Sequence, residues 1–291
     1  MGHVKPFSLF SEFDINLFKA GKHYRLYEKF GAHPATVNGE EGVYFAVWAP
    51  SAEQVFLIGE FNFWSAKDHL LQVRWDGSGI WEGFVPGLKM GVQYKYKIHS
   101  SNNGIVTEKA DPYAFSCEHP PRTASVAYDI ENYAWKDKEW LSYRKDKNGL
   151  DKPYAVLEVH LGSWMYNVDQ DRPLTYLELA DKLVTYLVEM AYTHVEFMPV
   201  MEYPYDPSWG YQLVGYFAPT SRFGSPKEFM FLIDQLHQND IGVILDWVPS
   251  HFPSDDHGLG FFDGSHLYEH PDKKKGYHQD WKSLIFNYGR N

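Results

Sequence analysis

The stretch that decides the fold is IGVILDWVPSH, from Ile241 to His251. Its apolar run, entered through Gly242, predicts a strand that is buried on both faces, as in a parallel sheet. Asp246 and His251 stand where this strand ends. The carboxyl ends of the strands form the active-site face of a parallel α/β barrel, so both side chains are candidates for a functional site. On the residues alone, an Asp that caps a loop and a structural His explain the pattern equally well.

Upstream of this strand, from Tyr154 onward, strand-like and helix-like segments alternate, which predicts parallel βαβ units. The expected strands are YAVLEVHLG (154–162), THVEFMPV (193–200) and GVILDWV (242–248). Each intervening helix should begin at a capping box, and the second also has proline at its first position. These boxes are Thr175 with Glu178, and Ser225 with Glu228.

The connection from Met201 to Gly224 is too long for a plain βα loop, and long loops of this kind usually carry function. A (β/α)8 barrel takes about 250 residues, which is more than this sequence has from Tyr154 onward. We therefore expect only the first three β/α units of an incomplete (β/α)8 TIM barrel in this sequence.

The N-terminal half has a different pattern. Between Gly42 and Val106, short strand-like runs are separated by turn signals, which is typical of an antiparallel β-sandwich. Lys136 to Asp151 is charged and nearly free of aliphatic residues, which indicates a linker. The predicted domains are an N-terminal extension (1–30), a β-sandwich (31–139), a linker (140–151) and a partial barrel (152–291).

Composition excludes several classes of partner. With 291 residues, of which 44% are hydrophobic, the chain can bury sizeable cores. The net charge of -11 argues against nucleic-acid binding, which needs clustered Lys and Arg, so we expect a neutral substrate. The sequence predicts no membrane span and no signal peptide. The single Cys117 fits a reducing compartment, and we expect a cytoplasmic protein.

No cofactor or metal site is expected. The chain has 14 histidines, but none shows the spacing of metal ligands. Asp255 and Asp256 are better explained as a solvated loop than as a calcium site.

Several long motifs resemble those of one enzyme family. They are HLGSW (160–164), YPYDPSWGYQLVGYFAPTSRFGSPKEF (203–229), ILDWVPSHF (244–252), GYHQDW (276–281) and FNYGRN (286–291). Together they closely resemble bacterial glycogen branching enzymes, which belong to the retaining α-amylase family of glycoside hydrolases. The upstream GVYFAVWAPSAEQVFLIGEFNFW (42–64) looks like the carbohydrate-binding sandwich that precedes the barrel in such enzymes.

The resemblance implies an α-glucan substrate, cleavage of an α-1,4 bond and transfer of the segment to a 6-hydroxyl. The retaining mechanism needs an Asp nucleophile and a Glu acid/base. In the family these follow the fourth and fifth strands, so no residue here matches either one, and Glu158 and Glu196 are not assigned the roles. We therefore expect the N-terminal portion of a branching enzyme that is inactive alone. A separate polypeptide with the remaining strands is a candidate partner, and a non-catalytic or vestigial glucan-binding protein is the alternative.

Three residues match the family's substrate site. The resemblance implies that Asp246 organises the site around the nucleophile, that His251 hydrogen-bonds the sugar beside the cleaved bond, and that Tyr211 stacks beneath it. Stacking suits a neutral sugar, because its apolar C–H face packs on a ring. Trp209 and Gln212 are further candidates in the same loop.

In the sandwich, Trp64 and Lys95 match positions that hold glucan in related starch-binding modules. The second aromatic residue of such sites would fall near Ile105, where no Trp stands. Packing for Trp64 and solvation for Lys95 are therefore the favoured explanations.

Overall fold

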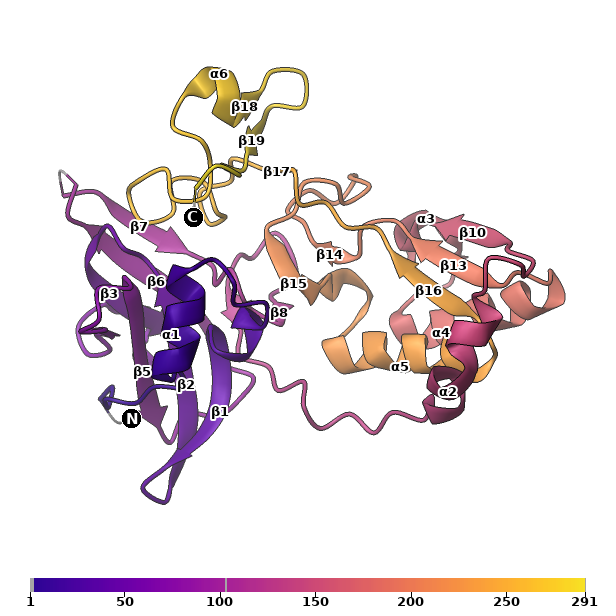
Figure 1. Ribbon diagram of the computed structural model, residues 1–291, viewed down its shortest axis with the longest axis horizontal. Helices are drawn as coiled ribbons and strands as arrows, with labels where there is room; N and C mark the ends of the chain where they lie inside the picture. Colours follow the sequence, from indigo (N-terminus) through magenta and orange to yellow (C-terminus); the bar gives the residue numbers. More distant parts are fainter. Residues whose placement is uncertain (1–2, 103, 291) are drawn as a thin grey trace. The chain divides into compact units, whose positions relative to one another are not determined.

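The computed structural model describes residues 3–102 and 104–290 and divides the chain into two compact units (Figure 1). Unit 1 comprises Met1–Asp129, Gln212–Ala218 and Pro249–Asn291, and unit 2 comprises Ile130–Tyr211 and Pro219–Val248. Neither unit is a continuous segment of the chain. This division differs from the predicted succession of 31–139, 140–151 and 152–291.

Unit 1 contains the predicted antiparallel β-sandwich, which is confirmed. One sheet has the strand order β1-β2-β5-β4, and the other has the order β3-β6-β9-β8 with β7 also paired to β6. The strands are β1 (Gly31–Val37), β2 (Glu40–Trp48), β3 (Ala52–Gly59), β4 (Gln72–Val73), β5 (Ile80–Pro86), β6 (Gln93–Ser100), β7 (Val106–Lys109), β8 (Ser116–Cys117) and β9 (Ser125–Val126). Before them lie helix α1 (Glu12–Lys19) and the short helix η1 (Leu26–Glu28), and η2 (Glu60–Asn62) follows β3.

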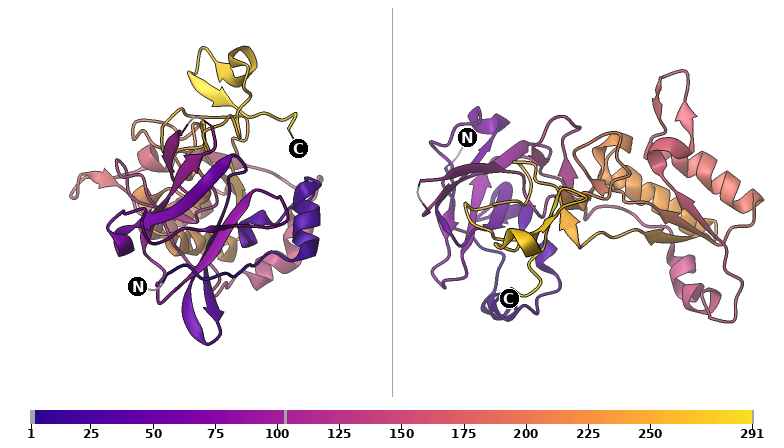
Figure 2. Two further views of the ribbon diagram at one scale, coloured as in Figure 1. Left: turned by 90° about the vertical axis from the view of Figure 1, so that its left-hand side faces the viewer. Right: turned by 90° about the horizontal axis from the view of Figure 1, so that it is seen from above.

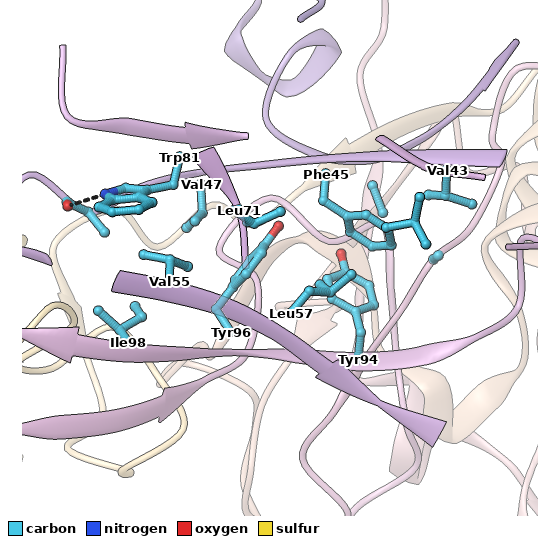
Figure 3. Close-up of a cluster of buried hydrophobic side chains, with 14 of the residues drawn as sticks. Val43, Phe45, Val47, Val55, Leu57, Leu71, Trp81, Tyr94, Tyr96 and Ile98 are labelled. Atoms are coloured by element: carbon cyan, nitrogen blue, oxygen red, sulfur yellow. Dashed lines mark hydrogen bonds between the residues drawn. The ribbon is translucent and has the colours of Figure 1, made fainter. Parts of the chain in front are cut away.

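Side chains from the two sheets meet in the interior of the sandwich (Figure 3). The rings of Phe45 and Tyr94 lie 4.9 Å apart in an edge-to-face contact, which aromatic pairs prefer. The indole N–H of Trp81 donates a hydrogen bond of 3.1 Å to the carbonyl of Ala49. Alternating apolar residues in β2 and β6 therefore give the sandwich its core.

A segment from the far end of the sequence completes this core. Phe262 and Leu267 pack in the same cluster as the sandwich side chains. Lys109, at the end of β7, donates from Nζ to the carbonyl oxygens of Asp256 and Gly260 at 2.6 and 2.7 Å. Burial lowers the pKa of Lys109 to about 8. Residues 256–267 are therefore held by the sandwich, which explains why they belong to unit 1.

The rest of this C-terminal segment forms a small antiparallel sheet in the order β17-β19-β18. It contains β17 (His251–Phe252), α6 (Lys273–Gly276), β18 (Tyr277–His278) and β19 (Ser283–Ile285). The part with α6 and β18, drawn in yellow, projects from the sandwich in Figure 1 and in the left view of Figure 2.

Unit 2 contains the predicted β/α units, which are confirmed. Parallel strands lie in the order β10-β13-β16, so β13 is in the middle. Helices α4 and α5 begin at the predicted capping boxes of Thr175 and Ser225, and both lie on the same side of the sheet (Figure 1). The main elements are β10 (Val156–Val159), α4 (Tyr176–Glu189), β13 (His194–Phe197), α5 (Pro226–Gln238) and β16 (Gly242–Leu245). Smaller elements in these connections are α3 (Leu161–Trp164), β11 (Tyr166–Asn167), β12 (Arg172–Pro173), β14 (Met201–Glu202), β15 (Gly215–Pro219) and η3 (Ser221–Phe223).

The segment predicted as a linker differs from that expectation, because it holds helix α2 (Lys138–Lys147). Trp140 is only 4% exposed, and its ring stacks on that of His237 in α5 at 5.3 Å. The charged residues of 140–151 hid this contact.

The prediction that the third strand is buried on both faces is wrong. In β16, Val243 and Ile244 are half-buried and Leu245 is 43% exposed. The physical reason is that β16 lies at an edge of its sheet, while the helices α4 and α5 cover one side. An apolar run specifies that a strand can be buried, but neighbouring strands and helices must supply the cover.

We predict that Gly242→Ala destabilises the protein. A Cβ at this position would lie 2.3 Å from Cδ2 of the buried His194. The His194 ring cannot easily move, because Tyr154 packs on it at 4.2 Å and Thr193 Oγ1 lies 2.9 Å from its Nδ1. Overpacking of this kind costs about 1–3 kcal/mol. Urea unfolding measures the loss, and Gly289→Ala is the control, because its Cβ would meet nothing closer than 3.7 Å.

Candidate functional site

The long loop between β13 and α5 is anchored by a buried ion pair. Arg222 donates from Nη1 to Glu202 Oε1 at 2.6 Å, and the two side chains are 8% and 3% exposed. Glu202 also accepts from the backbone N–H of Ser221 at 2.8 Å and from the hydroxyl of Thr220 at 3.1 Å. Both ends of the loop are therefore joined through one carboxylate.

Arg222 makes further contacts within the loop. Its guanidinium lies 4.0 Å from the centre of the Tyr203 ring, and Nη1 donates to the Tyr203 carbonyl at 2.8 Å. Its Nε donates to Asp206 at 2.6 Å. Sequence reasoning missed Glu202 and Arg222. A polar residue just after a buried strand and an arginine just before a capping box were the available signals.

The loop presents Tyr211 to the end of β16. The Tyr211 hydroxyl donates a hydrogen bond of 2.6 Å to Asp246 Oδ2, across 35 residues of sequence, and both residues are half-buried. Gly210, just before, has a φ of 88° and approaches the backbone of Pro199 so closely that a Cβ would lie 2.8 Å from its carbonyl oxygen. Only glycine fits this conformation and this approach. The structure therefore brings Tyr211 and Asp246 together.

Negative charge surrounds the Tyr211 hydroxyl. Its hydrogen bond to Asp246, together with burial and the charges of Asp246, Glu158 and Glu196, raises the pKa of Tyr211 to about 12. Glu158 and Glu196 occupy the same position in the neighbouring strands β10 and β13. The hydroxyl therefore stays protonated at neutral pH and acts as a donor to Asp246.

His251 belongs to unit 1, where β17 pairs it with Ile285 in β19. It is 7% exposed, and its carbonyl accepts from the Tyr216 hydroxyl at 3.0 Å. Its Nδ1 is buried and has no hydrogen-bond partner within 3–102 and 104–290. Burial, and then the neighbouring His278, lower the pKa of His251. The ring is therefore neutral at pH 7 and has one donor and one acceptor nitrogen.

The two other loop candidates differ in exposure and in contacts. Trp209 is 66% exposed. Gln212 is half-buried and belongs to unit 1, where its Nε2 donates to the carbonyl of Trp281 at 3.0 Å. The Gln212 amide is therefore engaged within the protein.

The two sandwich candidates are Trp64 and Lys95. Trp64 is 40% exposed and follows Phe63, which is 93% exposed. Lys95 donates from Nζ to the Thr123 hydroxyl at 2.6 Å, and burial lowers its pKa. The Thr123 hydroxyl thus occupies one donor of Lys95. Ile105 supplies no second aromatic ring for a sugar-binding site.

Among the residues placed by the structure, no group of three or more His, Cys, Asp or Glu side chains is arranged to hold a metal ion. Within the same residues, no helix combines the length and apolar character needed to cross a bilayer.

Comparison with known proteins relates this geometry to a family. Residues 29–114 match the model of "Carbohydrate-binding module 48 (Isoamylase N-terminal domain)", and residues 177–285 match "Alpha amylase, catalytic domain". The fold is similar to the crystal structure of a putative alpha amylase from Salmonella typhimurium, with a TM-score of 0.65 and 25% identity. That similarity covers 88% of this chain and 38% of the other.

Similar curated proteins are named 1,4-alpha-glucan branching enzyme GlgB. The protein from Thermosynechococcus vestitus is 52% identical over 97% of this chain and 39% of its own length. The protein from Gloeobacter violaceus is 53% identical over 98% of this chain and 39% of its own length. About half of the residues along nearly the whole chain are identical in these two branching enzymes, and the chain spans about two fifths of their length.

Proposed function

We propose that this chain is the α-1,4-glucan-binding part of a branching enzyme. Such an enzyme cleaves the glucan and transfers the cleaved segment to a 6-hydroxyl, as in glycogen biosynthesis. The observation that carries this proposal is the 2.6 Å hydrogen bond between Tyr211 and Asp246 at the end of β16. It holds a ring and a carboxylate together where α/β barrels carry their active sites. The names of the similar curated proteins support the same substrate class.

The chemistry of these residues suits a neutral sugar. A tyrosine ring offers a surface for the C–H face of glucose, and a carboxylate accepts hydrogen bonds from its hydroxyls. His251, being neutral, has one donor and one acceptor nitrogen for the same kind of partner. We assign substrate contacts to Tyr211, Asp246 and His251. Trp209 remains a candidate because its ring is exposed.

The reaction that we propose follows a retaining mechanism. A carboxylate nucleophile forms a glycosyl-enzyme intermediate, and a second carboxyl group protonates the leaving oxygen. No residue of this sequence matches either group, and we assign neither role to Glu158 or Glu196. We therefore propose that the polypeptide is inactive alone. We also propose that it resides in the cytoplasm, because a reducing compartment keeps its single Cys117 reduced.

The apolar edge of the parallel sheet supports a protein partner as well. Leu245 in β16 is 43% exposed, and the adjacent Trp247 is 52% exposed. An uncovered apolar edge strand is a template for pairing with another strand. We propose that a polypeptide that supplies further barrel strands covers it. The alternative function is that of a non-catalytic glucan-binding protein. It uses the same glucan-binding residues, but the chain then takes part in no reaction, either alone or with a partner.

Titration with maltoheptaose followed by NMR tests the glucan site. We expect weak binding, with a Kd on the order of 1 mM, because one stacked ring and a few hydrogen bonds barely offset the entropy lost on association. Tyr211→Ala should weaken binding by about two- to tenfold, since aromatic contacts contribute about 0.5–1.5 kcal/mol.

Tyr211→Phe is the matched variant, because it keeps the ring and removes only the hydrogen bond to Asp246. It should bind more tightly than Tyr211→Ala. Equal affinity of the wild type and Tyr211→Ala would show that Tyr211 is not part of a glucan site. Sub-micromolar binding that disappears in Tyr211→Ala would show a better-formed site than we propose.

A further inference from the structure

A half-exposed tryptophan lies against His251 in unit 1. Trp281 is 56% exposed and lies between β18 and β19. Its ring is parallel to that of His278, with centres 4.1 Å apart and an angle of 6°. The His251 ring lies 5.0 Å from it at 38°. The three rings form one cluster, which we call the Trp281 cluster.

The backbone of Trp281 is held on both sides. Its N–H donates to His278 Nδ1 at 3.3 Å, and its carbonyl accepts from Gln212 Nε2 at 3.0 Å. The neighbouring strands β18 and β19 are paired with each other, and β19 is also paired with β17, which carries His251. The indole is thus pre-oriented although more than half of its surface faces solvent. A pre-oriented ring loses little conformational entropy when a ligand binds.

We infer that the Trp281 cluster is a further binding surface for α-glucan, on which a glucose unit stacks against the exposed area of the Trp281 ring. The inference rests on the proposed function, because it extends the contact assigned to His251. His278 already covers one face of the indole, so the 56% exposure requires that a large part of the remaining surface is open. An apolar ring with polar rings at its side matches a sugar, which has an apolar C–H face and a rim of hydroxyls.

A neutral ligand fits the cluster better than a charged one. Burial, and then His278, lower the pKa of His251, so this imidazole is uncharged at pH 7. A neutral imidazole has one donor and one acceptor nitrogen, and a sugar hydroxyl can serve as acceptor or donor to either.

Fluorine NMR of the whole chain labelled with 5-fluorotryptophan tests the inference. The Trp281 resonance is assigned as the one missing from Trp281→Phe. We expect it to shift when maltoheptaose is added. Trp281→Ala should weaken the affinity by about two- to tenfold, and Trp281→Phe, which keeps a ring, should lose less. Trp75→Ala is the matched control, because Trp75 is 86% exposed on the same unit, and it should bind like the wild type.

The outcomes separate this inference from the proposed function. An unshifted Trp281 resonance, with binding that is unchanged in Trp281→Ala and weakened in Tyr211→Ala, overturns the inference and leaves the proposed function in place. A wild-type chain that binds no maltoheptaose overturns both. The resonance shift is measured on wild-type protein and Trp281→Phe supplies the assignment, so the test stands even if Trp281→Ala fails to fold.

Discussion

The purified 291-residue chain is expected to introduce no measurable α-1,6 branches into amylose. Retaining transfer needs a nucleophile and an acid/base, and no residue of this sequence matches either group. Loss of the nucleophile alone lowers the rate of a well-studied hydrolase by about a million-fold. Iodine staining of amylose measures the reaction, because branching reduces the colour of the amylose–iodine complex.

The control for this assay is a complete branching enzyme such as the Gloeobacter violaceus relative, prepared from the same host. The host must lack its own branching enzyme. Asp246→Asn is a useful second sample, because trace activity that survives this substitution unchanged would point to a contaminant. Branching by the wild-type chain that disappears in Asp246→Asn would contradict our proposal and would mean that carboxylates of this chain perform the reaction.

Arg222→Ala should be the most destabilising single substitution that we propose. The Arg222 and Glu202 side chains are 8% and 3% exposed and lie 2.6 Å apart. Removing one partner leaves the other charge buried and unpaired, which costs about 3–5 kcal/mol. The long loop would also lose the contacts of Arg222 to Tyr203 and Asp206. Urea unfolding followed by tryptophan fluorescence should show the transition of unit 2 at lower urea.

Arg172→Ala is the matched control for Arg222→Ala. Arg172 pairs with Glu178 at 2.7 Å, but the two side chains are 34% and 31% exposed, so we expect little change in stability. Arg222→Lys should give an intermediate result, because lysine keeps the charge but cannot make the forked contacts of a guanidinium. Equal unfolding midpoints for Arg222→Ala and Arg172→Ala would mean that the buried pair does not hold the loop.

The capping boxes show how far local sequence carries a prediction. Thr175 with Glu178 and Ser225 with Glu228 predict where α4 and α5 begin, and both helices start there. The bonds of a cap join residues three apart, so the pattern is visible in any short window. The same holds for the alternating strands of the sandwich, because side chains of a strand alternate between its faces.

The predicted linker and the third strand show where this reasoning stops. Trp140 is buried against His237, nearly a hundred residues later, so a charged segment became a packed helix. Leu245 lies in an apolar run but is 43% exposed, since it lies at an edge of the sheet. The burial of a segment depends on which strands and helices pack against it, and the local sequence does not contain that information.

The same distinction between local sequence and tertiary contacts applies to the candidate site. The sequence by itself determined the sandwich and the parallel β/α units, because these depend on local periodicity. It also determined the family motifs with Tyr211, Asp246 and His251, because these depend on matching residue types. Only the tertiary structure decided that Tyr211 donates a hydrogen bond to Asp246, that Arg222 joins the ends of the loop through Glu202, and that the Trp281 ring lies beside His251. Such contacts join residues 20 to 35 positions apart, and their geometry is set by strand register and by loops anchored elsewhere in the fold.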